Sequence, residues 1–177
     1  MKNDQIISAL DVTNWFYQKA SNKIISERKI QHLLFLSQLH FALKYGKLLM
    51  PSLFICADSG FYNADIKSIM KFGLPLMGKS NFTSSISDFL NLIWQKYGSQ
   101  TDDQLDKFIF SLEEWKHHYR PEKDTIVNPI DFVDSFANTI QNSKEKTSSN
   151  KTKVMMSQNG PVKVSSWQPR KLKSSNV

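Results

Sequence analysis

Four histidines and one cysteine are the residues whose side chains could bind a metal or act as a base or nucleophile. His32 and His40 are eight residues apart, about two helical turns, so they can share one face of a helix. No Asp, Glu or Cys lies at a spacing that completes a ligand set with them. His117 and His118 are adjacent, so on a helix they point to different sides. We expect structural or solvated histidines and no metal site.

The other polar motifs also have simpler interpretations than catalysis. Cys56 lies in an apolar run, where a thiol is most simply a small buried hydrophobe, and a base that activates it would have to come from elsewhere in the fold. Gly60 lies in a turn, residues 58–61, that could hold an anion, but the glycine spacing of nucleotide-binding loops is missing. Glu113 and Glu114 are expected on a solvated helix face. These patterns predict a protein that is not an enzyme and that needs no cofactor.

The element that must organise the chain is the stretch from residue 27 to residue 46, which predicts a helix buried on nearly every side. Ser26 can cap its first turn and Gly46 can end it. Ser37, Gln38 and His40 interrupt its apolar run, so we expect no membrane span. The apolar residues that cover most of its circumference are Ile30, Leu33, Leu34, Phe35, Leu36, Leu39, Phe41, Leu43 and Tyr45.

Amphipathic spacing and caps predict five further helices, which begin near Asp11, Asn63, Ser84 or Ser85, Thr101 and Asn128. The helix after Thr101 is expected to continue until Pro121. Pro51 interrupts the apolar run of residues 47–58, which favours a pair of short edge strands there. The predicted fold is therefore mainly α, a compact bundle of about six helices around the central helix 27–45, with a small β-hairpin element near residues 47–58.

The charge divides the chain into two parts. Residues 1–140 hold 15 Lys and Arg and 15 Asp and Glu, whereas residues 141–177 hold eight basic residues and one acid, Glu145. The formal charge of +7 therefore belongs to the C-terminal segment alone. We expect a neutral helical domain over residues 1–140 and a basic tail over 141–177. A single cysteine and the absence of an apolar leader at the start of the sequence favour the cytosol.

The tail is rich in Ser and Lys and lacks a helical stripe, so we expect it to be disordered in isolation. Two short apolar islands, 154–156 and 162–167, could anchor it to a partner. Basic residues around Trp167 could instead contact nucleic acid, because they combine phosphate-binding groups with a stacking surface. A solubilising tail, a partner-binding segment, a nucleic-acid contact and a targeting signal remain alternatives.

Five stretches follow one another in an order that is typical of a known family: LDVTNWFYQKA, KIQHLLFLSQLHFALKYGKLL, LNLIWQKYG, SLEEWKHHYRP and NPIDFVDSF. This order resembles the Panacea domain, a family that includes SocA-like antitoxins and phage-associated GepA-type proteins. The resemblance covers about residues 8–138 and excludes the tail. The positions that match the family's motifs are Asp11, Val12, Asn14, Leu33, Leu34, Gln38, His40, Ala42, Gly46, Trp94, Tyr97, Gly98, Trp115, Asn128, Pro129 and Ile130.

Two positions depart from the family pattern. The family's Trp-x-Tyr-Gly-Pro-Val motif corresponds to residues 57–62, which keep only its glycine, Gly60. The histidine that commonly precedes the family's late tryptophan is Phe110 here. If these positions serve binding, the chain has a different partner or has diverged from the shared role.

The resemblance implies a non-enzymatic protein that binds and neutralises a cognate toxin, or presents it for proteolysis, in the cytoplasm of a bacterium or a phage-infected host. The alternatives are a phage or secreted factor that acts on a host protein, with the basic C-terminus as an export signal, and a nucleic-acid-binding regulator that uses the tail. We expect the partner-binding residues to be Asp58, Ser59, Gly60, Phe61, Tyr62, Trp115, Lys116, Arg120, Met155 and Trp167.

Overall fold

The computed structural model describes residues 7–20, 25–73, 80–149, 153–157 and 160–164. Its residues cluster into two compact units, Met1–Ala137 and Asn138–Val177. The boundary lies three residues before the one that the charge distribution predicts.

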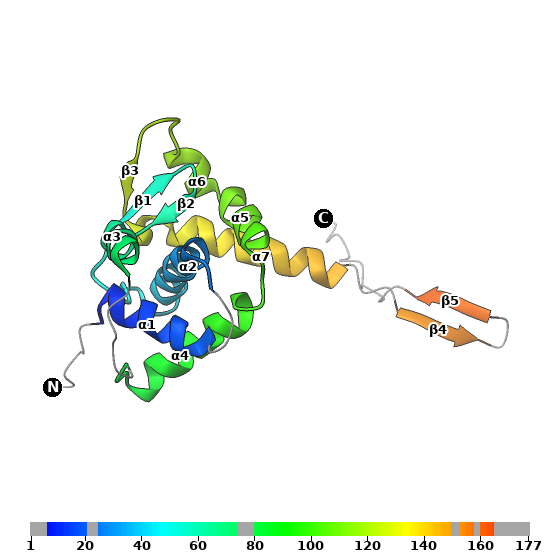
Figure 1. Cartoon of the computed structure of the whole chain (residues 1–177). Coiled ribbons are helices and arrows are strands. Elements are labelled where there is room, and N and C mark those ends of the chain that lie inside the picture. Colours follow the sequence, from blue (N-terminus) through cyan, green and yellow to red (C-terminus); the bar gives the residue numbers. More distant parts are fainter. Residues whose placement is uncertain (1–6, 21–24, 74–79, 150–152, 158–159, 165–177) are drawn as a thin grey trace, which may run out of the picture. The chain divides into compact units, whose positions relative to one another are not determined.

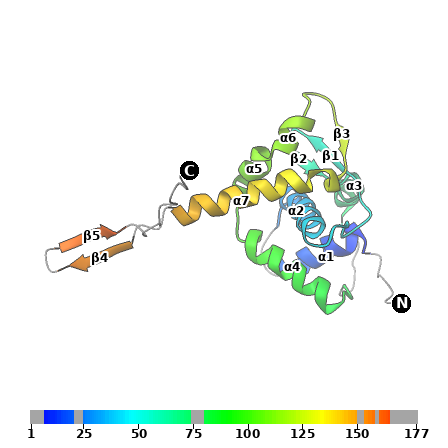
Figure 2. The same cartoon turned by 180° about the vertical axis from the view of Figure 1, so that it is seen from behind.

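Helix α2 (Glu27–Tyr45) is the centre of the first unit, as its apolar sequence predicts. Every residue from 30 to 39 is buried. The Ser26 side chain accepts a hydrogen bond from Lys29 N, and Gly46 ends the helix in the left-handed conformation, at φ 65°. Figures 1 and 2 show α2 enclosed by the other elements of this unit. The central helix is confirmed.

Helix α1 (Ala9–Ala20) begins before Asp11, so the prediction that Asp11 caps it is wrong. Ser8 occupies the capping place: its Oγ accepts from Asp11 N at 3.0 Å and donates to Asp11 Oδ2 at 2.7 Å. Asp11 therefore lies in the first turn, where a carboxylate is favoured by the helix dipole. The buried residues Val12, Phe16 and Ala20 face the core.

Helices α3 (Ala64–Phe72) and α4 (Ser84–Tyr97) lie where their caps predict. The Asn63 side chain accepts from Ile66 N at 3.0 Å and starts α3. Of the residues within α3 only Ile66 is buried, whereas α4 buries a full stripe, namely Phe89, Leu90, Ile93 and Tyr97. α4 is thus a wall of the core, and α3 is a surface helix.

The single helix expected between Thr101 and Pro121 is two helices, α5 (Asp102–Ser111) and α6 (Glu113–His118). Thr101 and Gln104 form the predicted capping box at the start of α5. The break lies at Leu112, which is extended (φ −66°, ψ 133°) and fully buried. Burial of this side chain in the core accounts for the break, and the chain leaves it in a new direction as α6.

Three short strands form one antiparallel sheet in the order β2-β1-β3: β1 (Phe54–Ala57), β2 (Gly60–Tyr62) and β3 (Thr125–Val127). Within the range 47–58 predicted for two strands only β1 is a strand, because its neighbours come from the following turn and from much later in the chain. Cys56 is paired with Phe61 on one side and with Thr125 on the other. The sheet therefore joins residues 54–62 to residues 125–127, which lie more than 60 residues later in the chain.

Aromatic rings fill the space between α2 and the sheet. Phe35 of α2 stacks on Phe61 of β2 with ring centroids 4.0 Å apart, and meets Phe54 of β1 edge to face at 5.3 Å. Phe132 closes this cluster from η1 (Pro129–Phe132), a 3-10 turn that Asn128 caps. The chain continues directly into α7 (Val133–Ser149), so the cap-then-proline start predicted at residue 128 is confirmed, with a 3-10 first turn.

Two glutamines on α2 hold neighbouring loops by their side-chain amides. Gln38 Oε1 accepts from Leu49 N and Met50 N, and its Nε2 donates to Met50 O. Gln31 Oε1 accepts from Asn63 N at 2.8 Å. Both side chains are buried, so they satisfy backbone groups that no water can reach.

The second unit contains the end of α7 and an antiparallel hairpin of β4 (Lys153–Ser157) and β5 (Gly160–Val164). The sequence analysis expected no regular structure in this segment, and the structure differs at these positions. Met155 pairs with Val162 in the register of the hairpin. The first apolar island, 154–156, lies within β4, and residues 162–164 of the second lie in β5, where β-branched valines are favoured. Residues 165–167 of the second island are outside the described residues.

The architecture is mainly α, as predicted, with seven α-helices and a three-stranded sheet in the first unit among the described residues. None of the helices in these ranges is long and apolar enough to cross a membrane.

Candidate functional site

His32 is buried next to two charged side chains, Asp106 and Arg28. Its Nε2 lies 2.8 Å from Asp106 Oδ1, and Arg28 Nε lies 3.0 Å from the same oxygen. The imidazole is fully buried, and burial lowers the pKa of His32 although Asp106 acts in the opposite direction. The buried ring therefore joins α2 to α5 through Asp106.

Gly60 lies directly against this histidine. Its φ is +97°, and a Cβ at this position would lie 2.9 Å from His32 Cε1 and 3.2 Å from Ile109 Cγ2. Only glycine fits both the backbone conformation and the space. The positive φ and the close packing on His32 therefore explain the glycine at this position.

His40 is also structural. Its Nε2 lies 2.8 Å from the Tyr97 hydroxyl, and burial lowers the pKa of His40 to about 3. The neutral ring therefore shares this hydrogen bond with the Tyr97 hydroxyl at physiological pH. Cys56 is buried as well, and burial raises the pKa of its thiol to about 11, so the thiol is protonated at neutral pH.

Helix α6 meets the β1–β2 turn. Trp115 Nε1 donates to Ala57 O at 3.3 Å, and Tyr119 hydrogen-bonds with Asp58, which raises the pKa of the Tyr119 hydroxyl. The rings of Trp115 and Tyr119 are stacked with centroids 4.4 Å apart. The structure thus brings together two segments that the sequence analysis selected separately, 58–62 and the end of the helix at 115–120.

Not all of those residues reach the surface. Asp58, Ser59, Lys116 and Arg120 are exposed and Trp115 is half-buried. These five residues are called the α6 surface below. Gly60, Phe61 and Tyr62 are buried, because β2 lies between β1 and α2, and so the expectation that they contact a partner directly is corrected.

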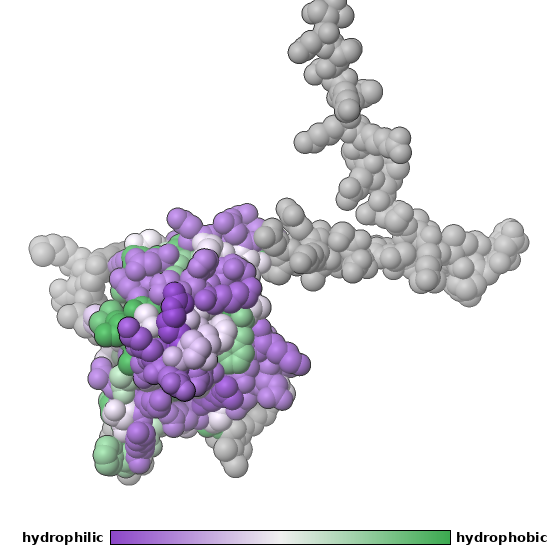
Figure 3. All heavy atoms as spheres, turned by 90° about the horizontal axis from the view of Figure 1, so that it is seen from above, coloured by the Kyte–Doolittle hydropathy of each residue, from purple (hydrophilic) through white to green (hydrophobic). Residues whose placement is uncertain are grey.

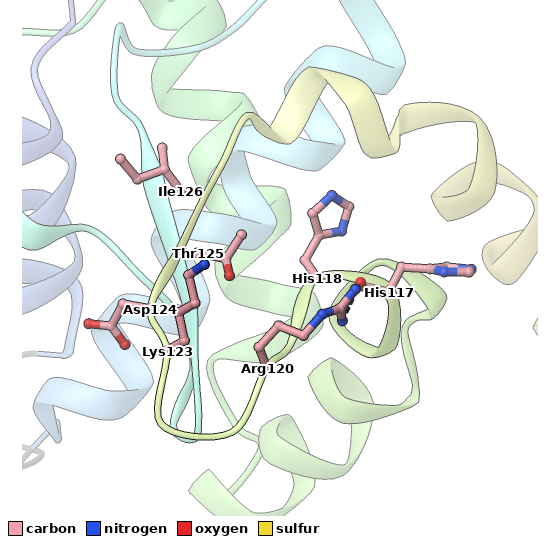
Figure 4. A pocket seen from close by; sticks show the side chains of 7 residues that line it. All are labelled: His117, His118, Arg120, Lys123, Asp124, Thr125 and Ile126. Atoms are coloured by element: carbon pink, nitrogen blue, oxygen red, sulfur yellow. Dashed lines mark hydrogen bonds between the residues drawn. The ribbon is translucent and has the colours of Figure 1, made fainter.

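An open hollow of about 480 Å³ lies beside the α6 surface, between the last turn of α6 and β3. Figure 4 shows its walls: His118 stands on the α6 side, and the segment that leads into β3 forms the other side. The lining residues are His117, His118, Arg120, Lys123, Asp124, Thr125 and Ile126. Figure 3 shows the first unit from above, and most of the surface on this side is hydrophilic.

The segment between α6 and β3 is shaped by a tight turn. Lys123 N donates to Arg120 O at 3.2 Å, with Pro121 second and Glu122 third in the turn. Glu122 has φ 60°, a conformation that costs a residue with a side chain about 1 kcal/mol. Arg120 Nη1 donates to His117 O and Tyr119 O, which satisfies carbonyls at the end of α6.

Glu114 has an unusual place for a carboxylate. Its predicted place is a solvated face beside Glu113, but it is only 3% exposed, and among the described residues neither of its carboxyl oxygens has a hydrogen-bond partner. Burial raises the pKa of Glu114. Glu113 does face solvent, where it pairs with Lys116 at 2.7 Å.

Two of the predicted contact residues belong to the second unit. Met155 lies in β4, while Trp167 is outside the described residues. Within the described ranges no three His, Cys, Asp or Glu side chains converge on a metal-binding position.

Sequence reasoning missed Asp106, Lys123 and β3. Asp106 is 74 residues from His32, so no local spacing links the two. The signal for β3 is present in the β-branched run of residues 125–127 between Pro121 and Asn128, which is typical of a short strand.

Comparison with family models, with curated proteins and with solved structures found no match to this chain.

Proposed function

We propose that this protein is a non-enzymatic protein-binding module of antitoxin type, which binds a partner toxin and neutralises it or presents it for proteolysis. The order of its sequence motifs, which resembles the Panacea domain, supports the proposal. The observation that carries it is the α6 surface, where the β1–β2 turn and the end of α6 converge.

The composition of this surface suits protein recognition. Trp, Tyr and Arg are the residue types that most often dominate binding energy at protein interfaces. Here Trp115 is held in place by its bond to Ala57 O and by the stacked Tyr119 ring, so little conformational entropy remains to be lost on binding. Lys116 and Arg120 are exposed beside it and can select a partner by charge.

The burial of His32 and Cys56 also supports a binding role. Neither side chain has exposed surface. Their surroundings explain them as packing and hydrogen-bonding residues.

Co-expression tests the proposal. The full chain is produced together with the product of the adjacent gene, in a host whose growth that product arrests. We expect rescue of growth and co-purification of the two proteins. The double variant Lys116→Glu/Arg120→Glu should lose both, and the matched control Lys44→Glu/Lys71→Glu, which reverses exposed lysines on α2 and α3, should keep both. An adjacent product that is harmless alone and does not co-purify would overturn the proposal.

A second candidate function is nucleic-acid binding by the basic segment, which the eight basic residues and one acid of residues 141–177 favour. It predicts binding to DNA or RNA that falls steeply with salt and is abolished when the basic residues of this segment are replaced by Gln. Weak binding that does not respond to salt would exclude it.

A further inference from the structure

Strand β3 is at the edge of its sheet. The order β2-β1-β3 leaves one side of β3 without a neighbouring strand, and no backbone hydrogen bond on that side joins it to any part of the chain that the structure describes. Ile126, the middle residue of the strand, is 69% exposed. An uncovered strand edge with an exposed apolar side chain is a template for another strand.

The hollow next to this edge is basic. Arg120 and Lys123 contribute full positive charges, and His117 and His118 line it with them. The one carboxylate in the lining, Asp124, accepts a hydrogen bond from the Tyr62 hydroxyl at 2.8 Å. Figure 4 shows the Asp124 side chain directed away from Arg120 and His118. The hollow therefore favours an acidic occupant.

We propose that the free edge of β3 is a docking site for an extended, acidic segment of the partner protein. The segment adds to the sheet as a fourth strand, its backbone pairs with β3, and its carboxylates lie beside Arg120 and Lys123. This inference rests on the proposed function, since it names the kind of partner segment that binds next to the α6 surface.

Charge distinguishes this occupant from two others. The C-terminal residues 165–177 contain Arg170, Lys171 and Lys173 and no acid, so the hollow would repel them. A second copy of the chain, paired through its own β3, would bring the same Arg120 and Lys123 to the interface. An acidic strand is the occupant that gains from both features of the site.

The shortness of β3 makes the charges necessary. Three residues can make only a few backbone hydrogen bonds to an added strand, and each contributes little net free energy. Specific binding therefore depends on the basic hollow as well, and both components can be removed separately.

Three synthetic peptides of equal length test the proposal against the full chain by fluorescence anisotropy. The first alternates Val and Thr between terminal Glu residues; the second replaces Glu with Lys; the third is the acidic peptide with backbone N-methyl groups that prevent strand pairing. We expect binding of the first, and affinity lower by about tenfold or more for the other two. Arg120→Glu/Lys123→Glu should weaken the first peptide's binding to a similar degree, whereas Lys71→Glu should not.

The basic segment 141–177 could attract an acidic peptide by charge alone, so a variant with its Lys and Arg residues replaced by Gln serves as the control. Binding that remains sensitive to N-methylation in this variant supports docking at β3. Equal binding of the acidic and N-methylated peptides, or binding that disappears in the Gln variant, would overturn it, as would dimerisation through β3 that Ile126→Lys abolishes.

The two proposals fail in different ways. A toxin that is neutralised while none of the peptides binds overturns docking at β3 and leaves the antitoxin function. Peptide binding with the expected selectivity, together with an inert adjacent product, overturns the antitoxin function and leaves docking at β3.

Discussion

Buried polar side chains on helix α2 are hydrogen-bonded, whereas, within the described ranges, the buried carboxyl on helix α6 is not. On α2, Gln38 and Gln31 are buried with partners for both amide atoms, and His32 keeps a carboxylate partner, its Nδ1 alone being unpaired. On α6, the buried Glu114 carboxyl has no hydrogen-bond partner in the part of the chain that the structure describes. The helix also starts at Leu112 without a side-chain cap.

The difference between the two helices indicates where this fold is optimised for stability. The surroundings of α2 satisfy almost every polar group, as expected of a core that specifies one structure. Helix α6 and the turn after it combine a buried carboxyl without a hydrogen-bond partner among the described residues, a positive φ at Glu122 and half-buried aromatic rings. Such costs are typical of surfaces that serve binding. Substitutions should therefore destabilise the α2 region strongly and change the α6 region little, or even stabilise it.

The largest effect is expected for Gln38→Met, a replacement of similar size. It leaves Leu49 N and Met50 N buried without partners, while Met50 O keeps its hydrogen bond from Ser52 N, so the free energy of unfolding should fall by about 3–5 kcal/mol. Urea denaturation measures the change. The matched control Gln95→Met, on an exposed face of α4, should change it by less than about 0.5 kcal/mol. Equal effects of the two variants on the free energy of unfolding would contradict the stabilising role of the buried Gln38 amide.

Gly60→Ala should cost about 3 kcal/mol, because the new Cβ must adopt a positive φ and also overlap the His32 ring. Gly46→Ala separates the two causes. Gly46 has φ +65° but nothing within 4 Å of an added Cβ, so only the conformational cost of about 1 kcal/mol remains. Thermal or urea unfolding measures both. A Gly60→Ala variant no less stable than Gly46→Ala would contradict the close packing on His32.

Glu114→Gln should have the opposite sign and stabilise the protein by about 1–2 kcal/mol at pH 7. Because burial raises the Glu114 pKa in the folded state, the contribution of the protonated carboxyl is fully present below its unfolded pKa and is lost as the pH rises through the folded pKa. The advantage of Gln should therefore shrink toward pH 4. Urea unfolding at both pH values tests this, with Glu113→Gln as the exposed control on the same helix. Destabilisation by Glu114→Gln at pH 7 would show that the carboxyl has a partner.

The smallest effect is expected at the turn after α6. Glu122→Asn should stabilise the fold by about 0.5 kcal/mol, since Asn adopts positive φ more readily than Glu. A differential scan of thermal unfolding resolves such a change, and binding to the partner should not alter. A clear loss of stability would mean that the Glu122 side chain makes a contact that matters.

Local signals predicted most of the fold. The caps at Ser26, Asn63, Thr101 and Asn128 fixed four helix starts, because a cap and the amide that it binds lie within three residues. The misses are non-local. Leu112 breaks its helix because its side chain fills the core, and β2 and β3 exist because they pair with β1. Neither cause can be read from a window of neighbouring residues.

The candidate site was predictable only in part. The two segments that form the α6 surface were found from the sequence, but not that Trp115 reaches Ala57 O or that Phe61 lies in the core. A strand residue with one side against a helix looks the same in sequence as one facing solvent. Lys123 and Ile126 acquire their importance only because β3 is at the edge of the sheet.

Hydrogen exchange of the full chain, alone and in complex with the product of the adjacent gene, tests the central claim most directly. We predict that complex formation slows exchange at residues 57–59 and 113–127, while amides of α2 are unchanged. Protection confined to the basic segment 141–177, or the absence of any complex, would contradict the assignment of partner binding to the α6 surface.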